Sequence, residues 1–307
     1  MRIKKAVGKG NMEATKVVVI GGAGFLGSHV ADELSARGYK VTVFDQVESE
    51  WQTDDQEMIV GDMQDRAQLE RACSGARYIY HFAGIADIGF AKNNPYDAIK
   101  ANVLGTATAL EVARKIGTDR FVYASTMYVY SGSGSFYRAS KQAAENIIEA
   151  YGEEFDLGYT LLRYGSLYGP RAQDWNGLRS YVEQIIHEGR LEYPGTGDER
   201  REYIHVKDAA RLSVDILADK HRNDAITVTG LQVLNSRELI DMIFEIAGKS
   251  PAVSFLGSPQ SSEHNHMTPY RYTPKQAKKI VPSEYIDLGQ GILEVLQEIN
   301  LASRDTS

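Results

Sequence analysis

The residues best suited to acid–base chemistry are Tyr137 and Lys141, four positions apart in the segment FYRASKQAAE. On a helix this spacing places both side chains on one face. A lysine ammonium near a phenol lowers the pKa of the phenol, so the tyrosine could act first as a general base towards a hydroxyl and later as a general acid. Thr126, at the end of a predicted strand, could hold the same substrate oxygen. The Tyr–Lys spacing alone is common on surface helices, so it does not define a site.

A glycine cluster follows the four β-branched residues Val17–Ile20, with Gly21, Gly24 and Gly27 at the spacing GxxGxxG. The continuous apolar run predicts a buried parallel strand. The glycines allow a tight turn and a close approach of the backbone to a ligand. The N-terminus of the helix that follows suits a pyrophosphate. Taken alone, the cluster is a weak signal, because glycines between a strand and a helix also form tight turns that bind nothing.

Two acids follow later strands of the pattern. Asp45 ends the second predicted strand, where a carboxylate can accept hydrogen bonds from both hydroxyls of an adenosine ribose. It would repel a 2′-phosphate, and no Arg or Lys follows in DQVESE, so NAD is favoured over NADP. A solvated loop acid is the alternative. Asp62, after Gly61, could accept a hydrogen bond from the adenine amino group.

Other residues that often do chemistry are interpreted as structural. His81 is expected to be a buried strand histidine, and Cys73 a buried small side chain rather than a nucleophile. Trp175 either lines a substrate cleft or packs in the core. No second ligand cluster accompanies His264 and His266, so we predict a polar loop there and no metal site.

The bulk composition bounds the class of protein. The chain has 307 residues, 43% hydrophobic and 24% charged, which suits one large α/β domain or a domain with a smaller lobe. The net charge of −7 argues against a nucleic-acid polymer as partner. One cysteine fits a reducing compartment, so we predict the cytoplasm. No apolar run is long enough to span a membrane. Residues 1–14 are expected to be a disordered leader or tag.

Strands and helices alternate up to residue 164, which predicts right-handed crossovers and a doubly wound parallel sheet. The predicted strands are Val17–Ile20, Lys40–Phe44, Met58–Val60, Tyr78–Phe82, Arg120–Ala124 and Tyr159–Arg163, and the predicted helices are Gly24–Arg37, Arg66–Ala72, Tyr96–Ile116 and Tyr137–Tyr151. Gly165–Gly177 is expected to be a loop that crosses a cleft. Residues 165–307 are expected to form mainly a smaller α/β substrate lobe, with some segments returning to the first domain.

The order of the motifs carries a resemblance. They are GGAGFLG at 21–27, Asp45, GD at 61–62, HFAG at 81–84, NVLGT at 102–106, YASTMYVY at 123–130, YRASK at 137–141, LRYGSLYGPR at 162–171 and REYIHVKDAA at 201–210. Together they resemble the extended branch of the short-chain dehydrogenase/reductase superfamily, the nucleotide-sugar epimerases and dehydratases that include UDP-glucose 4-epimerase.

The resemblance implies a Rossmann-type domain over residues 15–164 that keeps NAD tightly bound, and a nucleoside diphosphate sugar as substrate. The family's catalytic residues fall on Thr126, Tyr137 and Lys141. Its cofactor residues fall on Gly21, Gly24, Phe25, Leu26, Asp45, Asp62, Met63, Phe82, Ala83, Gly84, Tyr137, Lys141 and Tyr164. Its substrate residues fall on Thr126, Ser166 and Arg201, with Arg201 as the clamp on the diphosphate. Relatives often form homodimers by packing the helices that correspond to 96–116 and 137–151.

Three departures from the family pattern bear on the reaction. Met127 and Tyr128 stand where 4,6-dehydratases carry Asp-Glu, so elimination and decarboxylation lose their acids. Ser166 replaces an asparagine that contacts the substrate phosphate. Only Ser131–Phe136 separates Tyr130 from Tyr137, where relatives have a longer loop over the sugar, so the site is either open or takes a different or larger sugar.

These observations predict an NAD-dependent nucleotide-sugar epimerase that acts at C4 through a transient 4-keto sugar. The catalytic triad of Thr126, Tyr137 and Lys141 is complete, and the acids that an elimination needs are missing. Both observations favour this function. A nucleotide-sugar reductase or dehydrogenase that releases its cofactor is one alternative. A non-catalytic NAD-binding module is the other.

Overall fold

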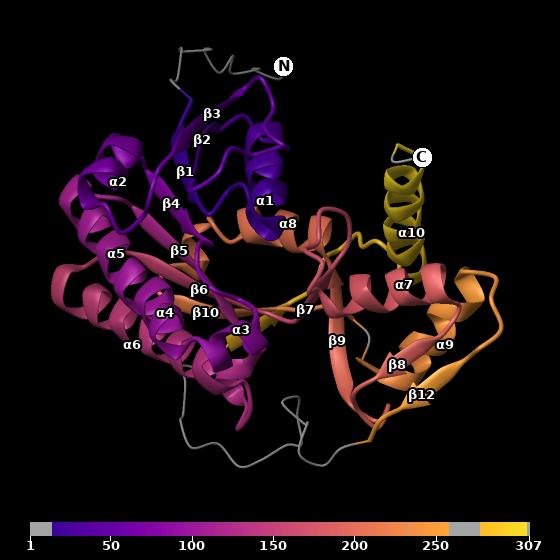
Figure 1. The fold of residues 1–307 in the computed structure, drawn as a ribbon. Coiled ribbons are helices and arrows are strands. Elements are labelled where there is room, and N and C mark those ends of the chain that lie inside the picture. The colour runs from indigo at the N-terminus through magenta and orange to yellow at the C-terminus, as the bar shows by residue number, and fades with distance from the viewer. Residues whose placement is uncertain (1–13, 232, 258–276, 306–307) are drawn as a thin grey trace, which may run out of the picture.

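The computed structural model describes residues 14–231, 233–257 and 277–305 (Figure 1). Residues 1–13 of the expected leader 1–14 lie outside them. Eight parallel strands form the main sheet in the order β13-β10-β6-β5-β4-β1-β2-β3. Their bounds are β1 Lys16–Ile20, β2 Lys40–Asp45, β3 Gln56–Val60, β4 Tyr78–His81, β5 Arg120–Thr126, β6 Tyr159–Tyr164, β10 Asp224–Val228 and β13 Ala277–Ile280. The predicted α/β fold with a parallel sheet is confirmed.

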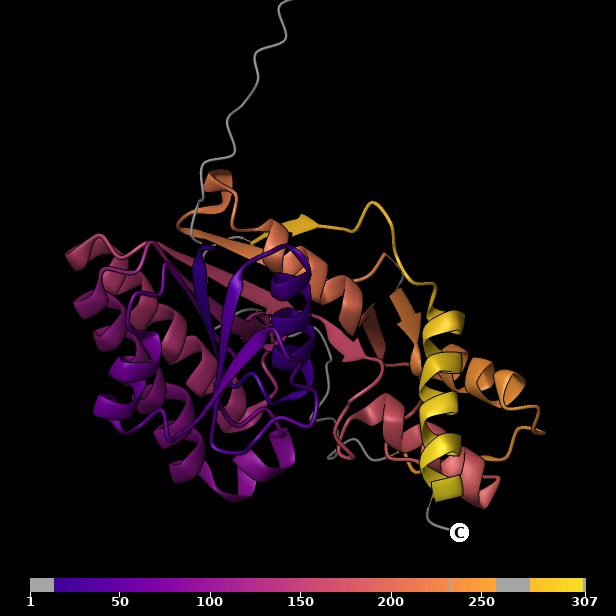
Figure 2. The same cartoon turned by 90° about the horizontal axis from the view of Figure 1, so that it is seen from above.

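Alternating residues of β1 supply the two faces of this sheet. Val18 and Ile20 pack with one helix layer, and Val17 and Val19 pack with the other, which explains why the whole run is apolar. One layer holds α2 (Arg66–Cys73), α5 (Gly105–Ile116) and α6 (Ser135–Phe155). The other holds α1 (Phe25–Ala36) and α8 (Val206–Asp215). Figure 2 shows the sheet between these layers.

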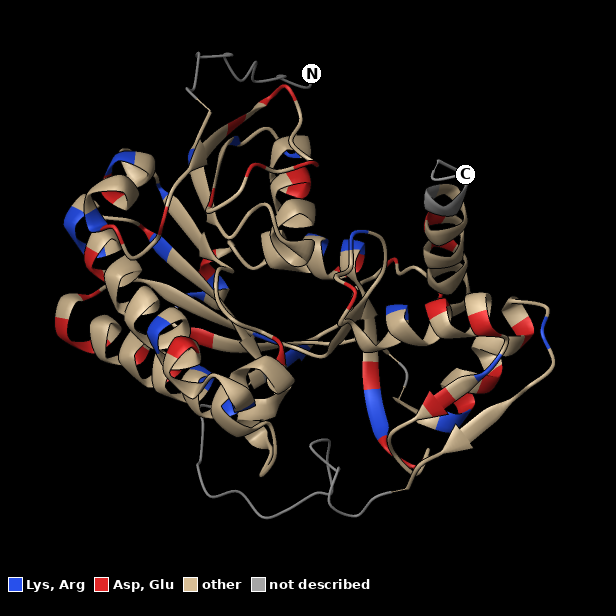
Figure 3. Cartoon of the chain, viewed as in Figure 1, with Lys and Arg blue, Asp and Glu red and all other residues tan. Residues whose placement is uncertain are grey.

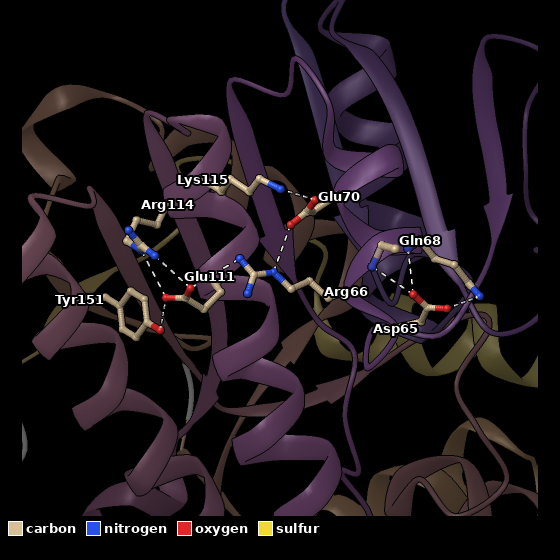
Figure 4. A network of polar contacts seen from close by, with 9 residues as sticks. Asp65, Arg66, Gln68, Glu70, Glu111, Arg114, Lys115 and Tyr151 are labelled. Atoms are coloured by element: carbon tan, nitrogen blue, oxygen red, sulfur yellow. Dashed lines mark hydrogen bonds and ion pairs between the residues drawn. The ribbon is translucent and has the colours of Figure 1, made fainter.

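Exposed polar contacts tie α2, α5 and α6 together (Figure 4). Glu70 accepts from Lys115 Nζ at 2.6 Å and from Arg66 Nε at 3.0 Å. Glu111 accepts from the Tyr151 hydroxyl at 2.7 Å and pairs with Arg114. Solvated ion pairs of this kind stabilise a fold only slightly, so the apolar contacts under these helices provide most of the stabilisation.

The predicted helix Tyr96–Ile116 is not regular. Its residues form α4 (Pro95–Ile99), the π-helical turn η1 (Lys100–Leu104) and then α5. Asn102, in this turn, accepts a hydrogen bond from Ile85 N at 2.7 Å and donates to Ser140 Oγ at 2.9 Å. Such turns often occur at functional sites. Here the turn links the loop after β4 to helix α6.

A second lobe packs around its own apolar core. Its sheets are β7 (Ser166–Tyr168), β9 (Arg200–His205) and β11 (Val233–Asn235), and β8 (Leu191–Tyr193) with β12 (Val253–Phe255); its helices are α7 (Gly177–Glu188), α9 (Ser236–Ile246) and α10 (Leu288–Asp305). The prediction of a continuous loop over Gly165–Gly177 is wrong, because β7 lies within it and pairs with β9. β10 and β13, although late in the chain, extend the main sheet.

Two further differences concern short elements. The helix α3 (Ile88–Asn93) has no counterpart among the predicted elements, and the 3-10 helix η2 (Met127–Tyr130) follows β5 directly. A shorter one, η3 (Asp219–His221), precedes β10. Asp87 caps α3 by accepting a hydrogen bond from Phe90 N at 3.0 Å, and Thr126 caps η2 in the same way. Both elements border the cavity described next.

Candidate active site

A cavity of about 1050 Å³ lies between the main sheet and the second lobe. The strand order reverses between β1 and β4, where parallel α/β sheets bind ligands beyond the carboxyl ends of their strands. Residues from the ends of β1, β4, β5 and β6 line one side, and β7, α7 and β9 line the other. The volume is at the upper end for small-molecule sites, so it suits a long ligand or two ligands end to end.

The glycine turn after β1 forms one end of the cavity. Gly21 has φ 84° and donates to Phe44 O at 2.8 Å. A Cβ at Gly21 would overlap the backbone of Ala83, so only glycine lets the turns after β1 and β4 meet. Gly24 caps α1 in an extended conformation, and the first turn of α1 carries no acid. The exposed amide end of α1 is therefore suited to an anion.

Asp45 lies at the end of β2 and lines the cavity. Its Oδ2 accepts from Ala23 N at 3.0 Å, and its Oδ1 accepts from Gln46 N at 2.7 Å. The carboxylate is thereby fixed against the glycine turn. Each of its oxygens keeps a further lone pair for a ligand hydroxyl. Gln46 also lines the wall, and the sequence contains no signal for it.

Asp62, for which a contact with adenine is predicted, is absent from the cavity lining among the described residues. Its Oδ1 accepts a hydrogen bond from Gln64 N at 2.9 Å, which holds the turn after β3. The neighbours Gly61, Met63 and Gln64 lie on the wall instead. The contact from the Asp62 side chain to an adenine stays a prediction, and Gln64 is a polar side chain on the neighbouring wall.

The remaining predicted cofactor residues all line the cavity: Phe25, Leu26, Met63, Phe82, Ala83, Gly84 and Tyr164, together with Gly21 and Gly24. The positions of these residues on the cavity wall do not by themselves establish contacts with a cofactor, so those contacts stay a prediction. Ile85–Gly89, in the turn after β4 and the start of α3, also lines the cavity. Sequence reasoning missed this segment because no motif marks it beyond HFAG.

Thr126, Tyr137 and Lys141 meet at the middle of the cavity. Thr126 ends β5, and the other two lie one turn apart on α6. Their side chains are nearly inaccessible, and the Thr126 side chain acts on the Tyr137 phenol to lower its pKa. Lys141 Nζ donates to Ala124 O at 2.8 Å and lies 4.7 Å from the centroid of the Tyr123 ring.

The expected lowering of the Tyr137 pKa is not found in this structure. Burial raises the pKa of Tyr137 to about 12, although the hydrogen bond to Thr126 acts in the opposite direction. Burial also lowers the pKa of Lys141 to about 8, and the nearby Glu145 opposes this shift. Lys141 Nζ lies 6.0 Å from the Tyr137 ring centroid and turns to the Ala124 carbonyl. The helix spacing places the two residues on one face but does not aim the ammonium at the phenol.

A buried charge pair behind the triad was missed in the sequence. Glu145, two turns after Tyr137 on α6, accepts from Arg163 at 2.9 and 2.7 Å and from Ser125 Oγ at 2.6 Å. Arg163 also donates to the Tyr130 hydroxyl at 2.6 Å. These contacts connect α6 to β5 and β6, so they fix the helix that carries Tyr137. Only the fold brings these positions together.

The opposite wall holds the predicted substrate residues Ser166 and Arg201. Among the described residues no carboxylate lies within ion-pair distance of Arg201. Figure 3 shows its strand, β9, as a basic segment between acidic ones. Burial alone would lower the pKa of Arg201, but the hydroxyls of Tyr203, Tyr128, Tyr181 and Tyr193 raise it overall. The guanidinium thus stays charged at the cavity and free to bind an anion.

Trp175 lines the cavity and is 50% exposed, so the cleft-wall alternative applies rather than core packing. His81 is buried, its Nε2 lies 3.0 Å from Thr106 Oγ1, and burial lowers its pKa to about 3. Burial raises the pKa of Cys73 to about 12. Both residues are structural. His264 and His266 lie outside the described residues.

No group of three or more His, Cys, Asp or Glu residues within 14–231, 233–257 and 277–305 could hold a metal ion. In the same ranges no helix has both the length and the apolar character needed to cross a membrane.

The chain is similar to known proteins along most of its length. The model of the NAD dependent epimerase/dehydratase family matches residues 17–229. A UDP-glucose 4-epimerase of Rhizobium meliloti is 28% identical over 279 residues, which cover 77% of this chain and 83% of that protein. UDP-glucuronic acid decarboxylase 4 of Arabidopsis thaliana is 30% identical over 234 residues, which cover 67% and 52%.

A solved structure agrees with these sequences. The UDP-glucose 4-epimerase of Thermus thermophilus in complex with NAD has a TM-score of 0.75 and 26% identity, with 93% of this chain and 99% of that chain covered. Because the family model spans well over half of the residues, the chain belongs to the NAD-dependent epimerase/dehydratase family.

Proposed function

We propose that this protein is an NAD-dependent nucleotide-sugar epimerase that acts at C4 of the sugar. The observation that carries the proposal is that the buried residues Thr126, Tyr137 and Lys141 line one cavity. The glycine turn after β1 and Arg201 line the same cavity. Relatives that share the family are UDP-glucose 4-epimerases. Residues 165–307 provide most of the substrate side, although α8, β10 and β13 among them belong to the main sheet and its helix layer, and residues 15–164 provide the cofactor side.

The residues present fit NAD. The backbone cradle at Gly21 has no room for a Cβ, and the first turn of α1 is free of acids, so a pyrophosphate can approach the helix. The fixed Asp45 carboxylate suits the hydroxyls of an unphosphorylated ribose. Bound NAD supplies the hydride acceptor and donor and a positive nicotinamide charge that favours the Tyr137 phenolate.

The protein's own groups handle the proton and the orientation. Tyr137 takes the proton of the C4 hydroxyl, and Thr126 holds the same oxygen through its hydroxyl. After the transient 4-keto sugar has rotated within the site, Tyr137 returns the proton to the oxygen at C4. Arg201 binds the diphosphate, and Ser166 lies beside the path between the two sites. Binding energy from this non-reacting part leaves the sugar free to rotate.

Elimination and decarboxylation are less well supported, although one relative is a UDP-glucuronic acid decarboxylase. Met127 and Tyr128 line the cavity beside Tyr137 where related dehydratases carry acids. Neither side chain has a carboxylate. A reaction that needs a second general acid and base therefore lacks them here.

The test is the fate of cofactor and substrate in purified protein. We expect NAD to survive dialysis, and UDP-glucose to be converted to UDP-galactose or another UDP-sugar to its C4 epimer, followed by NMR. Tyr137→Phe should lower kcat about a thousandfold and leave NAD bound, whereas Tyr285→Phe, outside the main cavity, should not.

Other outcomes identify the alternatives. A requirement for added cofactor with net oxidation or reduction of the sugar points to a reductase or dehydrogenase. Bound NAD without turnover of any UDP-sugar in a broad panel points to a binding module. Activity that survives Tyr137→Phe contradicts the assigned chemistry.

We further propose a homodimer in the cytoplasm. Five large apolar side chains remain exposed on α3, α4, η1 and the start of α6, which lie together in Figure 1: Phe90, Tyr96, Ile99, Leu104 and Phe136. Exposed apolar side chains on adjacent helices are typical of a protein interface. Three of these residues, Tyr96, Ile99 and Leu104, lie in 96–116, one of the two helices through which relatives are expected to pair. The single cysteine, buried and reduced, supports the compartment.

A further inference from the structure

Tyr128 lies at the place where the chain is shortest relative to its family. It belongs to η2, and Thr126 Oγ1 accepts a hydrogen bond from its backbone N at 3.2 Å. Ser131 N donates to Tyr128 O at 2.9 Å, which folds the following turn back onto it. Thr126, whose hydroxyl caps this residue, lines the same cavity as Tyr137. Tyr128 is thus connected to the triad through its own backbone.

The turn that follows is shaped around the Tyr128 ring. Gly134 has φ 97°, and a Cβ there would come within 2.9 Å of Tyr128 Cδ1. A glycine is therefore required twice, for the left-handed backbone and for the space that the ring occupies. The short segment does not reach over the cavity as a longer loop would, and Tyr128 lines the cavity at this place.

The ring also packs on the proposed catalytic phenol. The Tyr128 and Tyr137 rings meet edge to face, with centroids 6.2 Å apart. Tyr137 shares a small apolar cluster with the buried Ala91 and Ala98, and Ile85 and Ile88 pack against this cluster, as Tyr128 does. Edge-to-face pairs prefer this geometry and restrict each other's orientation. Without Tyr128, one side of Tyr137 would face the cavity and water.

The hydroxyl end of Tyr128 is electrostatically close to the opposite wall. It is one of the hydroxyls that raise the pKa of Arg201, and it also acts on Tyr137. Tyr128, Tyr137 and Arg201 all line the same cavity, so a substrate that contacts Tyr137 and Arg201 shares the cavity with the Tyr128 side chain.

We propose that Tyr128 is a positioning residue for Tyr137 and, through its hydroxyl, a binding residue for the nucleotide sugar. The ring keeps water from the phenol of Tyr137 and fixes its orientation, in place of a longer loop. The hydroxyl contacts the part of the substrate between the sugar C4 and the diphosphate. This inference rests on the proposed function, because it assumes that Tyr137 is the base and that Arg201 binds the diphosphate.

Two variants separate the roles of ring and hydroxyl. Tyr128→Ala removes the ring, so water reaches Tyr137 and the pKa of its phenol falls. The rising limb of the plot of kcat against pH should therefore move to a pH about one unit lower. The value of kcat on the plateau should also fall. Tyr128→Phe keeps the ring, so the limb should stay in place while KM for the UDP-sugar rises about three- to tenfold.

Tyr285→Ala is the control, since Tyr285 is 57% exposed and lies outside the main cavity. It should change neither the limb nor KM. A Tyr128→Ala enzyme that loses only thermal stability, with an unmoved limb, overturns the positioning role. An unchanged KM in Tyr128→Phe overturns the binding role.

Failure of the proposed function gives a different result. In that case wild-type protein converts no UDP-sugar, and the variants are compared by the ultraviolet absorbance of tyrosinate in nucleotide-free protein, with Tyr137→Phe as the blank. A lower pKa of Tyr137 in Tyr128→Ala supports the positioning role without any turnover. An unchanged pKa overturns it.

Discussion

At the scale of single residues, burial drives Tyr137 and Lys141 towards their neutral forms. The pKa of Tyr137 rises to about 12 while that of Lys141 falls to about 8. A neutral phenol attracts an ammonium only weakly, which agrees with a lysine that donates to Ala124 O rather than to the phenol. A positive charge brought by a cofactor would stabilise the phenolate but compete with the ammonium. A cation bound beside these residues would therefore favour the phenolate form of Tyr137 and the neutral form of Lys141.

The Lys141 pKa predicts a pH dependence of stability. Between about pH 8 and the usual lysine value, the unfolded chain binds a proton that the native protein does not. In this window the free energy of unfolding of nucleotide-free protein should rise with pH by about 1.4 kcal/mol per unit from this group. Below the window both states are protonated, and the penalty for burying the charge is complete. The stability contribution is thus gained as pH rises.

Lys141→Met removes that dependence. Its stability advantage over wild type, measured by urea unfolding, should be largest near neutral pH and should shrink as the pH rises through the window. Lys115→Met, at an exposed ion pair, is the matched control and should show no such trend. A constant difference between Lys141→Met and wild type at all pH values would contradict a buried lysine with a lowered pKa.

At the scale of elements, the Glu145–Arg163 pair fixes α6 to β6, and both side chains are almost completely buried. Glu145→Ala leaves an unpaired guanidinium in the interior and should lower the free energy of unfolding by about 3–5 kcal/mol. Replacing both residues by methionine should cost clearly less, because no charge remains unpaired.

Urea unfolding of the single and the double variant measures this difference. Glu70→Ala, at an exposed pair on α2, should leave the midpoint close to that of wild type. If the single and the double variant lose equal stability, the pair is not the reason why α6 holds its place.

The elements that the sequence predicts correctly have strong local signals. Val17–Ile20 followed by glycines predicts β1 and α1, and the apolar run before Ser125 predicts β5. β7 and β12 have three residues each, which is too short for any period to show, and β7 forms only because β9 lies beside it. For this reason Gly165–Gly177 is predicted wrongly as a loop. Sheet-edge strands such as β13 likewise depend on partners distant in the chain.

The same limit applies to the site. Motif order predicts that Thr126, Tyr137 and Arg201 share a cavity, and the structure places them there. Side-chain direction is a different matter. Asp62 accepts a hydrogen bond from Gln64 N in its own loop, and Lys141 donates to the Ala124 carbonyl, and neither contact is visible in the order of the motifs. Glu145 with Arg163 depends on α6 and β6 packing together, which no local pattern encodes.

At the scale of the whole molecule, the question is what covers the exposed face of α3, α4 and η1. Tyr96 is 72% exposed and Leu104 is 56% exposed, although both lie on helices that pack firmly by their other faces. A second copy of the chain, related by a two-fold axis, would cover the same residues on both partners at once. A charge at the centre of such an interface would lack a partner and would weaken it strongly.

Leu104→Glu should therefore convert the proposed dimer to a monomer, as measured by light scattering coupled to size exclusion. Leu301→Glu is the matched control, since Leu301 is 62% exposed on α10 in the second lobe. The cavity is lined by residues of one chain, so the Leu104→Glu monomer should retain bound NAD. A wild-type protein that is already monomeric would contradict the dimer, and a monomeric variant without NAD would mean that the second copy supports the site from a distance.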